Sequence, residues 1–202
     1  MRFFSLLLAL FFPLYSSSVP FRQSPALASS SAPSLAQKIS LPGISNAGKI
    51  SDDLFRGAQP HLSDLAELKK LGITTIVDLR SESHHTRDRE RLQAESLGIH
   101  FVSLPVGGFS TPTSAQLAEF FSLLRETPPR KIFVHCEFGE DRTGIFIAAY
   151  RIAFDHWSPD QALAEMLAFG FRRFWHPSMV TFVRDLPERL QSDPLLKSTL
   201  AN

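Results

Sequence analysis

The sequence predicts an α/β fold with a central, mostly parallel sheet of four or five strands flanked by helices. Short apolar runs typical of buried strands alternate with longer segments whose apolar residues recur at helical spacing. This order favours parallel strands joined by crossover helices. The chain has 202 residues, of which 44% are hydrophobic, and this is ample for one core.

The individual elements follow from local pattern. Strands are expected near residues 50–56, 74–79, 100–104 and 131–135. Helices are expected over residues 62–71, 86–97, 113–125 and 143–154, from about 159 to 168, and after Pro177. Gly72 and Gly98 stand where two helices should end, and Ser158 to Gln161 has the form of a capping box.

Residues 1–28 are predicted to be a secretory signal peptide. Met1 and Arg2 precede an apolar block over residues 3–15, and Ala26-Leu27-Ala28 offers a small-residue cleavage site. The block is shorter than the roughly 20 residues of an ordinary membrane span; an uncleaved membrane anchor is the alternative. The mature chain is therefore expected to be periplasmic or secreted, without stable membrane association after signal cleavage.

The rest of the chain is expected to form one domain. Residues 29–48 are rich in Ser, Ala and Pro, a composition typical of a flexible linker. The folded domain is expected over residues 49–190, which is the usual size of a single domain. Residues 191–202 are expected to be a C-terminal tail.

The turn between the strand at 131–135 and the helix at 143–154 contains the only cysteine. Cys136 stands six residues before Arg142. Successive backbone N–H groups in such a turn can form an anion-binding nest, and the positive end of the next helix points to the same place. These surroundings favour thiolate over thiol, so Cys136 is expected to act as a nucleophile.

Neighbouring residues have the chemistry of a phosphate site. Arg142 offers a planar fork for two phosphoryl oxygens, and Thr143 can donate its hydroxyl to the cysteine sulfur. Gly139 stands where a tight loop needs a backbone conformation that residues with a Cβ resist. The other residues expected to line the site or orient its loop are His135, Glu137, Phe138 and Glu140.

The pattern His-Cys-x5-Arg-Thr-Gly at 135–144 resembles the cysteine-dependent protein tyrosine phosphatases, most closely their compact dual-specificity branch in bacteria. The resemblance extends to residues 54–60 and 72–80 and covers about residues 49–190. It implies a compact tyrosine phosphatase-like catalytic domain that hydrolyses phosphate monoesters through a cysteinyl-phosphate. It also implies activity on phosphotyrosine and on phosphoserine or phosphothreonine.

One part of that family's pattern is missing. These phosphatases usually carry a general-acid aspartate about thirty residues before the cysteine, but residues 104–112 contain neither Asp nor Glu. Asp141 is the first candidate for a substitute, because Asp-Arg-Thr also occurs in the inositide phosphatases of the myotubularin and Sac types. Its alternative role is to brace Arg142 or a backbone N–H. Asp78 and Glu82 are weaker candidates.

Charge and spacing restrict partners and cofactors. The formal net charge is +1 with acids and bases interspersed, so no nucleic-acid footprint is present. The seven histidines lack metal-ligand spacing, and we expect chemistry without a metal or other cofactor. The expected partner is a phosphorylated protein or a small phosphomonoester.

Two alternatives remain at this point. Glu137, Glu140 and Asp141 would repel a polyphosphorylated inositol, but the missing loop acid keeps a phosphoinositide or small-metabolite phosphatase open. A phosphate-binding pseudo-phosphatase is the other alternative, although a binding module has no need of a nucleophile such as Cys136.

Overall fold

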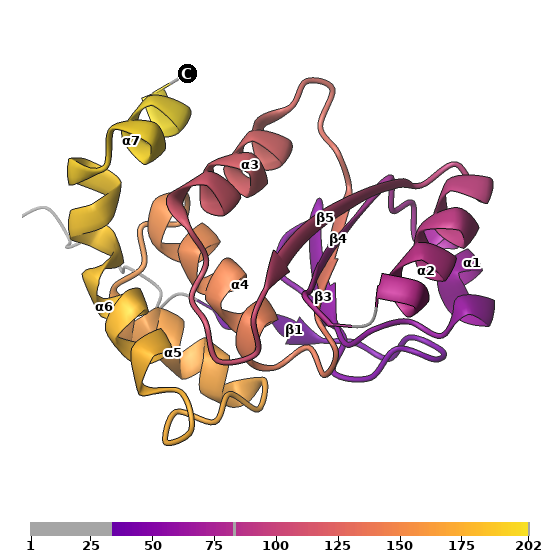
Figure 1. The fold of residues 1–202 in the computed structure, drawn as a ribbon, viewed down its shortest axis with the longest axis horizontal. Coiled ribbons are helices and arrows are strands. Elements are labelled where there is room, and N and C mark those ends of the chain that lie inside the picture. Colours follow the sequence, from indigo (N-terminus) through magenta and orange to yellow (C-terminus); the bar gives the residue numbers. More distant parts are fainter. Residues whose placement is uncertain (1–33, 83, 202) are drawn as a thin grey trace, which may run out of the picture. The chain divides into compact units, whose positions relative to one another are not determined.

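A central sheet organises the part of the chain that the computed structural model describes, residues 34–82 and 84–201 (Figure 1). Its six strands have the order β1-β2-β3-β6-β4-β5. The strands β3, β6, β4 and β5 run parallel, whereas β1 and β2 add antiparallel pairs at one edge. The strands are β1 (Gln37–Lys38), β2 (Gly48–Lys49), β3 (Leu54–Gly57), β4 (Thr75–Arg80), β5 (His100–Val106) and β6 (Ile132–His135).

The parallel strands confirm the predicted α/β architecture. Each overlaps one of the four expected segments, and the sheet is mostly parallel as expected. The sheet has six strands within the described residues rather than four or five. The two additional strands, β1 and β2, are only two residues long. Strands that short leave no period-two pattern in a sequence.

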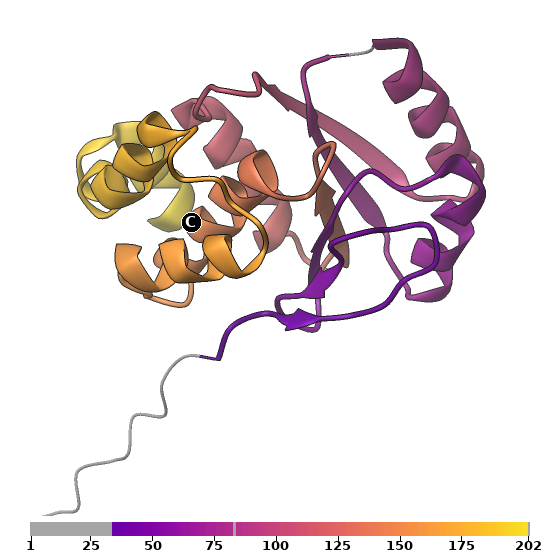
Figure 2. The same ribbon diagram turned by 90° about the horizontal axis from the view of Figure 1, so that it is seen from below.

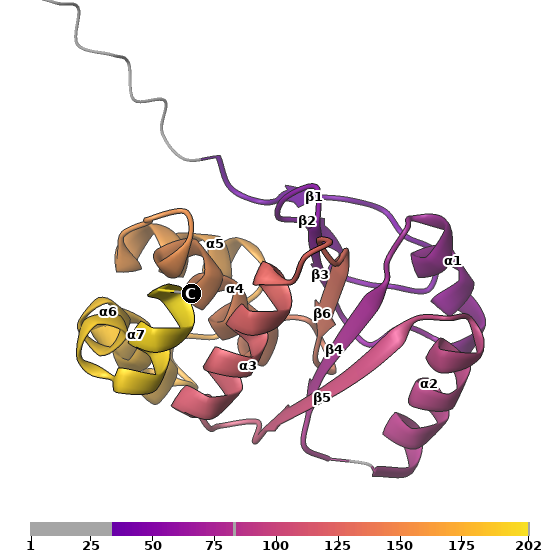
Figure 3. The same cartoon turned by 90° about the horizontal axis from the view of Figure 1, so that it is seen from above.

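Helices cover both faces of the sheet (Figures 1 and 3). The helices are a 3₁₀ turn η1 (Leu62–Asp64), α1 (Leu65–Lys70), α2 (His84–Ser96), α3 (Ser114–Arg125), α4 (Asp141–Ala153), α5 (Pro159–Ala168), α6 (Pro177–Ser192) and α7 (Pro194–Ala201). Helices α1 and α2 lie on one face, and α3 to α7 lie on the other. Phe133 of β6 packs in the cluster with Leu68 of α1, and Val134 packs in the cluster with Phe146 of α4. Because both faces are covered, β6 is apolar on both sides.

The predicted helix signals are present in the structure. The side chains of Ser158 and Gln161 form the expected capping box at the start of α5. Gly72 and Gly98 have φ angles of 86° and 69°, the left-handed conformation that ends α1 and α2. Helix α4 is buried on nearly all sides, and it begins at Asp141, directly beside the cysteine-containing turn.

Two predicted boundaries differ from the structure. Part of the expected linker is ordered, because β1 pairs with β2 and the Ala36 N–H donates to Glu165 Oε2 at 2.6 Å. The expected C-terminal tail contains helix α7. The carboxylate of Asp193 accepts the Leu195 N–H at the start of that helix, and Leu196 is fully buried.

The predicted signal peptide lies outside the described residues, as does the beginning of the linker. Within residues 34–82 and 84–201, no helix is both long enough and apolar enough to cross a bilayer.

Candidate active site

The loop from Cys136 to Glu140 joins β6 to α4 at the carboxyl end of the parallel strands, where ligands of open α/β sheets bind. Cys136 is 3% exposed and Arg142 is 7% exposed. The sequence motif is therefore folded into a compact, largely buried loop, which we call the cradle (residues 136–142).

Most carbonyl groups of the cradle accept hydrogen bonds. Gly144 N–H, in the first turn of α4, bonds the Glu140 carbonyl at 2.9 Å. Four other donors are His135 Nδ1 to Cys136 O (3.0 Å), Gln59 N to Glu137 O (3.1 Å), Asn46 Nδ2 to Phe138 O (3.4 Å) and Arg56 Nη2 to Gly139 O (2.6 Å). Five consecutive carbonyls are thus occupied from outside, which leaves the backbone N–H groups of the turn to face an anion.

Gly139 is essential to this geometry, as predicted. Its φ angle is 70°, and a Cβ placed on it would lie 2.4 Å from the carbonyl carbon of Gly57. The cradle therefore rests directly on the backbone that follows β3, and a side chain at position 139 would separate the two.

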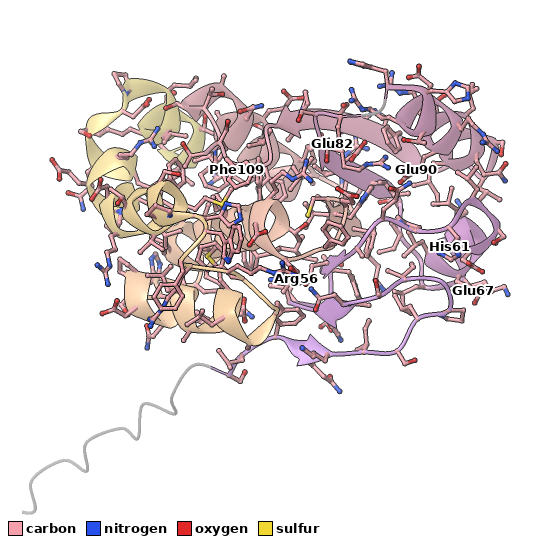
Figure 4. The ribbon with its side chains drawn as sticks, turned by 60° about the horizontal axis from the view of Figure 1, so that its bottom comes forward. Arg56, His61, Glu67, Glu82, Glu90 and Phe109 are labelled. Atoms are coloured by element: carbon pink, nitrogen blue, oxygen red, sulfur yellow. The ribbon has the colours of Figure 1, made fainter. Side chains whose placement is uncertain are left out.

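Arg56 is a supporting residue that the sequence analysis did not single out. It is fully buried on β3, and its guanidinium lies 4.1 Å from the centre of the Phe169 ring (Figure 4). Burial lowers the pKa of Arg56 to about 10, so it remains charged at neutral pH. The only sequence signal was an arginine inside an apolar strand, which requires a buried partner.

Arg142 is oriented by Glu82, in the loop between β4 and α2 (Figure 4). Its Nη1 donates to Glu82 Oε2 at 2.8 Å, and its Nη2 lies 2.7 Å from Glu82 Oε1. Nη1 also approaches the Val106 carbonyl at 3.4 Å. A bidentate pair of this kind fixes the plane of the guanidinium. The pKa of Glu82 falls to about 2, chiefly because of its hydrogen bond with Arg142.

Two of the three candidate acids therefore hold no proton at neutral pH. Glu82 is a carboxylate paired with Arg142. Asp78 is buried and accepts two bonds from the Arg80 side chain, at 2.8 and 2.9 Å. Burial alone would raise the pKa of Asp78, but the bonds from Arg80 and the nearby His135 lower it. Both oxygens of each carboxylate contact an arginine side chain, so neither residue is placed to donate a proton to a leaving group.

Asp141, unlike Glu82 and Asp78, lines the cavity beside the cradle. Its Oδ1 accepts the Arg172 N–H at 3.2 Å, and its Oδ2 lies 3.3 Å from His176 Nε2. His176 stacks on Phe109, whose ring centre is 5.1 Å away, in the loop after β5 that lacks the usual acid (Figure 4). Asp141, His176 and Phe109 line a cavity of about 250 Å³ beside the cradle, together with Phe138, Glu140, Arg172 and Trp175.

His135 connects the cradle to a buried ionic network. Its Nδ1 donates to the Cys136 carbonyl, while its Nε2 lies 2.9 Å from Glu90 Oε1. Arg80 bridges Glu90 and Asp78 through contacts of 2.7 and 2.8 Å. Burial alone would lower the pKa of His135, but the two carboxylates raise it. An imidazolium suits both contacts, because each ring nitrogen then carries a proton to donate.

The remaining predicted site residues lie in or next to the cradle. The Thr143 hydroxyl is buried and has no hydrogen-bond partner among the described residues, so this structure does not contain the expected bond to the Cys136 sulfur. Glu137 and Phe138 are exposed at the rim, and Glu137 Oε2 lies 3.9 Å from Arg142 Nη2. The structure therefore brings all nine predicted site residues to one turn, the last residue of β6 and the start of α4.

Sequence comparison agrees with this geometry. The profile of a family described as "DSP-PTPase phosphatase fused to NAD+ Kinase" matches residues 43–179. Dual specificity protein phosphatase TpbA from Pseudomonas aeruginosa is 29% identical over 163 residues, covering 79% of this chain and 66% of TpbA, just under two thirds of its length. Human dual specificity protein phosphatase 26 is 27% identical over 126 residues, covering 60% of this chain and 58% of that protein.

Solved structures show the same fold. The crystal structure of P. aeruginosa TpbA has a TM-score of 0.64 and 27% identity, covering 85% of this chain and 99% of that one. A TpbA variant in complex with pTyr has the same TM-score and 25% identity, covering 85% of this chain and 98% of that one.

Proposed function

The chain belongs to the DSP-PTPase phosphatase family, and from this premise we propose that it hydrolyses phosphate monoesters through a cysteinyl-phosphate intermediate. The observation that carries the proposal is the cradle itself. Five of its backbone carbonyls, those of residues 136–140, accept hydrogen bonds, and Cys136 and Arg142 stand at its two ends. This arrangement provides a nucleophile and an anion site at one point.

In the first step, the Cys136 thiolate attacks phosphorus in line with the ester oxygen. The S–P bond forms as the P–O bond to the leaving group breaks. The backbone N–H groups of the cradle and Arg142 hold the three phosphoryl oxygens as they become equatorial in the transition state. Water then attacks the cysteinyl-phosphate, releasing inorganic phosphate and the thiolate.

We assign the proton transfers to Asp141. Of the three candidate carboxyl groups, Glu82 and Asp78 are held as carboxylates by arginine side chains. Asp141 is the one that lies on the wall of the cavity beside the cradle. In this assignment it protonates the leaving oxygen in the first step and accepts a proton from water in the second. Its contacts with Arg172 N–H and His176 hold the carboxyl group in place.

The proposed substrates are phosphotyrosine and phosphoserine or phosphothreonine in proteins. Support comes from the relatives named dual specificity protein phosphatases and from the TpbA variant in complex with pTyr. No contact in the described residues specifically favours a phosphoinositide or a small metabolite, and the acidic side chains at the rim disfavour polyphosphates.

The test is turnover of p-nitrophenyl phosphate in reductant and a metal chelator. We expect turnover by the wild type and none by Cys136→Ser, because serine is a far weaker nucleophile at neutral pH. Turnover that survives Cys136→Ser would overturn the mechanism. Phosphate binding by a reduced wild type that does not turn over would favour a pseudo-phosphatase.

We also propose that the protein is exported, on the basis of the signal-like pattern of residues 1–28. A fusion of these residues to a reporter that is active only outside the cytoplasm should be active. A mature N-terminus near residue 29, determined by mass spectrometry, would identify the cleavage site. An inactive fusion would contradict export.

A further inference from the structure

Large aromatic side chains are exposed around the mouth of the cradle. Phe109, Phe138, Phe174 and Trp175 are 72, 62, 86 and 70% exposed. They come from three loops: β5–α3, the cradle, and α5–α6. We call these four residues the aromatic rim. Exposed apolar side chains are normally scattered singly over a soluble protein, so a cluster of four requires an explanation.

The three loops lie along one edge of the folded unit (Figures 1 and 2). Phe109, Phe138 and Trp175 line the same cavity as Asp141, and Phe174 is next to Trp175 in sequence. Three residues of the aromatic rim therefore line the cavity beside the cradle. Whatever covers the rim will also be close to the cradle.

The α5–α6 loop combines aromatic and cationic side chains. Residues 171–176 read Phe-Arg-Arg-Phe-Trp-His, and Arg172 and Arg173 are exposed. The guanidinium of Arg173 lies 5.0 Å from the centre of the Phe174 ring. Arg172 is partly neutralised, because its Nε is 3.6 Å from Glu140 Oε2. Arg173 has no ion pair within the described part of the chain, so its guanidinium is available to bind an external anion.

This combination fits a lipid surface better than a peptide groove. Peptide and small-molecule sites bury their aromatic residues in a concave wall. Phe174 lies outside the lining of the cavity and is 86% exposed, and Trp175 is 70% exposed although it also lines the cavity. Aromatic side chains next to arginine are typical of segments that bind the bilayer interface. There the rings enter the headgroup region while arginine contacts anionic phosphates.

We propose that the aromatic rim docks reversibly on an anionic lipid bilayer. Phe174 and Trp175 enter the headgroup region, and Arg173 contacts lipid phosphates. Such docking is peripheral, in contrast to the spanning or anchored association considered from the sequence. It concerns the folded unit alone and does not depend on the fate of residues 1–28.

Tryptophan fluorescence can test the proposal on the full chain. The protein has two tryptophans, of which Trp157 is buried and Trp175 is in the rim. Residues 1–33 contain none, so an N-terminal segment that binds lipid by itself does not produce the signal. Vesicles of phosphatidylcholine with phosphatidylglycerol should shift the emission of Trp175 to shorter wavelength, and brominated lipid should quench it. Trp175→Phe should abolish both effects.

Phe174→Ser is the test variant, and Leu92→Ser is its matched control. Leu92 is also an exposed apolar residue, at 67%, but it lies on α2, away from the rim loops. Phe174→Ser should weaken partitioning about tenfold, as expected for losing one large apolar side chain from the interface. Arg173→Ser should weaken binding to anionic vesicles more than to phosphatidylcholine alone. Leu92→Ser should bind like the wild type.

Turnover of soluble p-nitrophenyl phosphate by Phe174→Ser should equal that of the wild type, so failure to dock is distinct from failure of the phosphatase chemistry. An unchanged Trp175 spectrum on anionic vesicles would overturn the proposal. A Trp175 response to an aromatic phosphopeptide without one to vesicles would also overturn it, in favour of a protein partner.

Discussion

At the residue scale, Arg142 depends on a carboxylate that the sequence analysis considered in a different role. Glu82 holds both terminal nitrogens of Arg142, at 2.8 and 2.7 Å, and so fixes the plane of the guanidinium beside the cradle. The hydrogen bond with Arg142 lowers the pKa of Glu82 to about 2, so Glu82 is a carboxylate at neutral pH. Glu82 is therefore a positioning residue, and it acts through Arg142.

Glu82→Gln should lower kcat/KM for p-nitrophenyl phosphate by about 10- to 100-fold, because a misoriented Arg142 no longer matches the equatorial oxygens. Inhibition by inorganic phosphate should weaken in the same variant. Glu67→Gln, which breaks a surface pair of 2.7 Å with Lys70 on α1, is the matched control and should leave both values unchanged. Equal kcat/KM for Glu82→Gln and the wild type would show that the pair has no catalytic role.

Asp141→Asn tests the assignment of the general acid. The variant preserves the shape of the side chain but cannot donate an acidic proton. Turnover of an alkyl phosphate should fall by roughly 10²- to 10⁴-fold, whereas p-nitrophenyl phosphate, whose leaving group needs little protonation, should be affected much less. An equal loss on both substrates would indicate that Asp141 only braces the cradle.

His176→Phe separates the role of the imidazole nitrogen near Asp141 from the role of ring stacking on Phe109. Phenylalanine can keep the stacking on Phe109, which lies 5.1 Å away, but it removes the nitrogen 3.3 Å from Asp141 Oδ2. We expect His176→Phe, like Asp141→Asn, to lose more turnover on an alkyl phosphate than on p-nitrophenyl phosphate, but by a smaller factor. The double variant with Asp141→Asn should be no slower than Asp141→Asn alone, because the two residues act as one unit. Additive losses in the double variant would separate their roles.

At the element scale, the cradle packs against the Gly57–Ala58 peptide at the end of β3. Gly139 makes the contact possible, and Arg56 and Asn46 bond the Gly139 carbonyl at 2.6 and 3.1 Å. The strand β3 therefore supports the loop that follows β6, its parallel neighbour in the sheet.

Gly139→Ala should destabilise the fold by about 1–3 kcal/mol and abolish turnover, because alanine disfavours positive φ and its Cβ would collide with Gly57. Gly108→Ala is the matched control, since a Cβ there meets nothing within 4 Å. Urea unfolding and p-nitrophenyl phosphate turnover check both variants. A stable, active Gly139→Ala would mean that the cradle does not need this conformation.

The sequence predicted the cradle but not its supports, for a physical reason. Cys136, Gly139 and Arg142 act within one turn, so their spacing alone indicates the geometry. Arg56 and Glu90 reach the turn from other elements, and only the folded sheet brings them there. The signal available for them was a charged residue at a position that a strand or helix buries.

At the scale of the whole folded unit, prediction succeeded where a pattern extends over many residues. The four parallel strands and six of the seven α-helices in the described residues lie where apolar runs, helical spacing or caps predicted them. The edge strands β1 and β2 were missed because two residues carry no period. Helix α7 was missed because it follows α6 after a single residue and contributes only Leu196 to the core.

The buried network around His135 makes the stability of this unit depend on pH. The pKa of His135 is raised in the folded protein, so protonated His135 stabilises the fold. This contribution is fully present below about pH 6.5, the ordinary value for histidine, and is lost as pH rises through the folded-state pKa. The free energy of unfolding should therefore decrease over that range. Glu90 is the partner that carries the effect, at 2.9 Å from Nε2.

Urea unfolding from about pH 6 to about pH 9 measures this dependence, in a Cys136→Ser background so that thiol ionisation does not contribute. His135→Asn should be less stable than its parent at the low end, with the difference shrinking as pH rises. Parallel curves for His135→Asn would contradict this prediction, because they would show that His135 has the same pKa in the folded and unfolded states. A difference that grows with pH would show that the imidazole is neutral in the folded protein and holds the cradle by a neutral Nδ1–H bond to the Cys136 carbonyl.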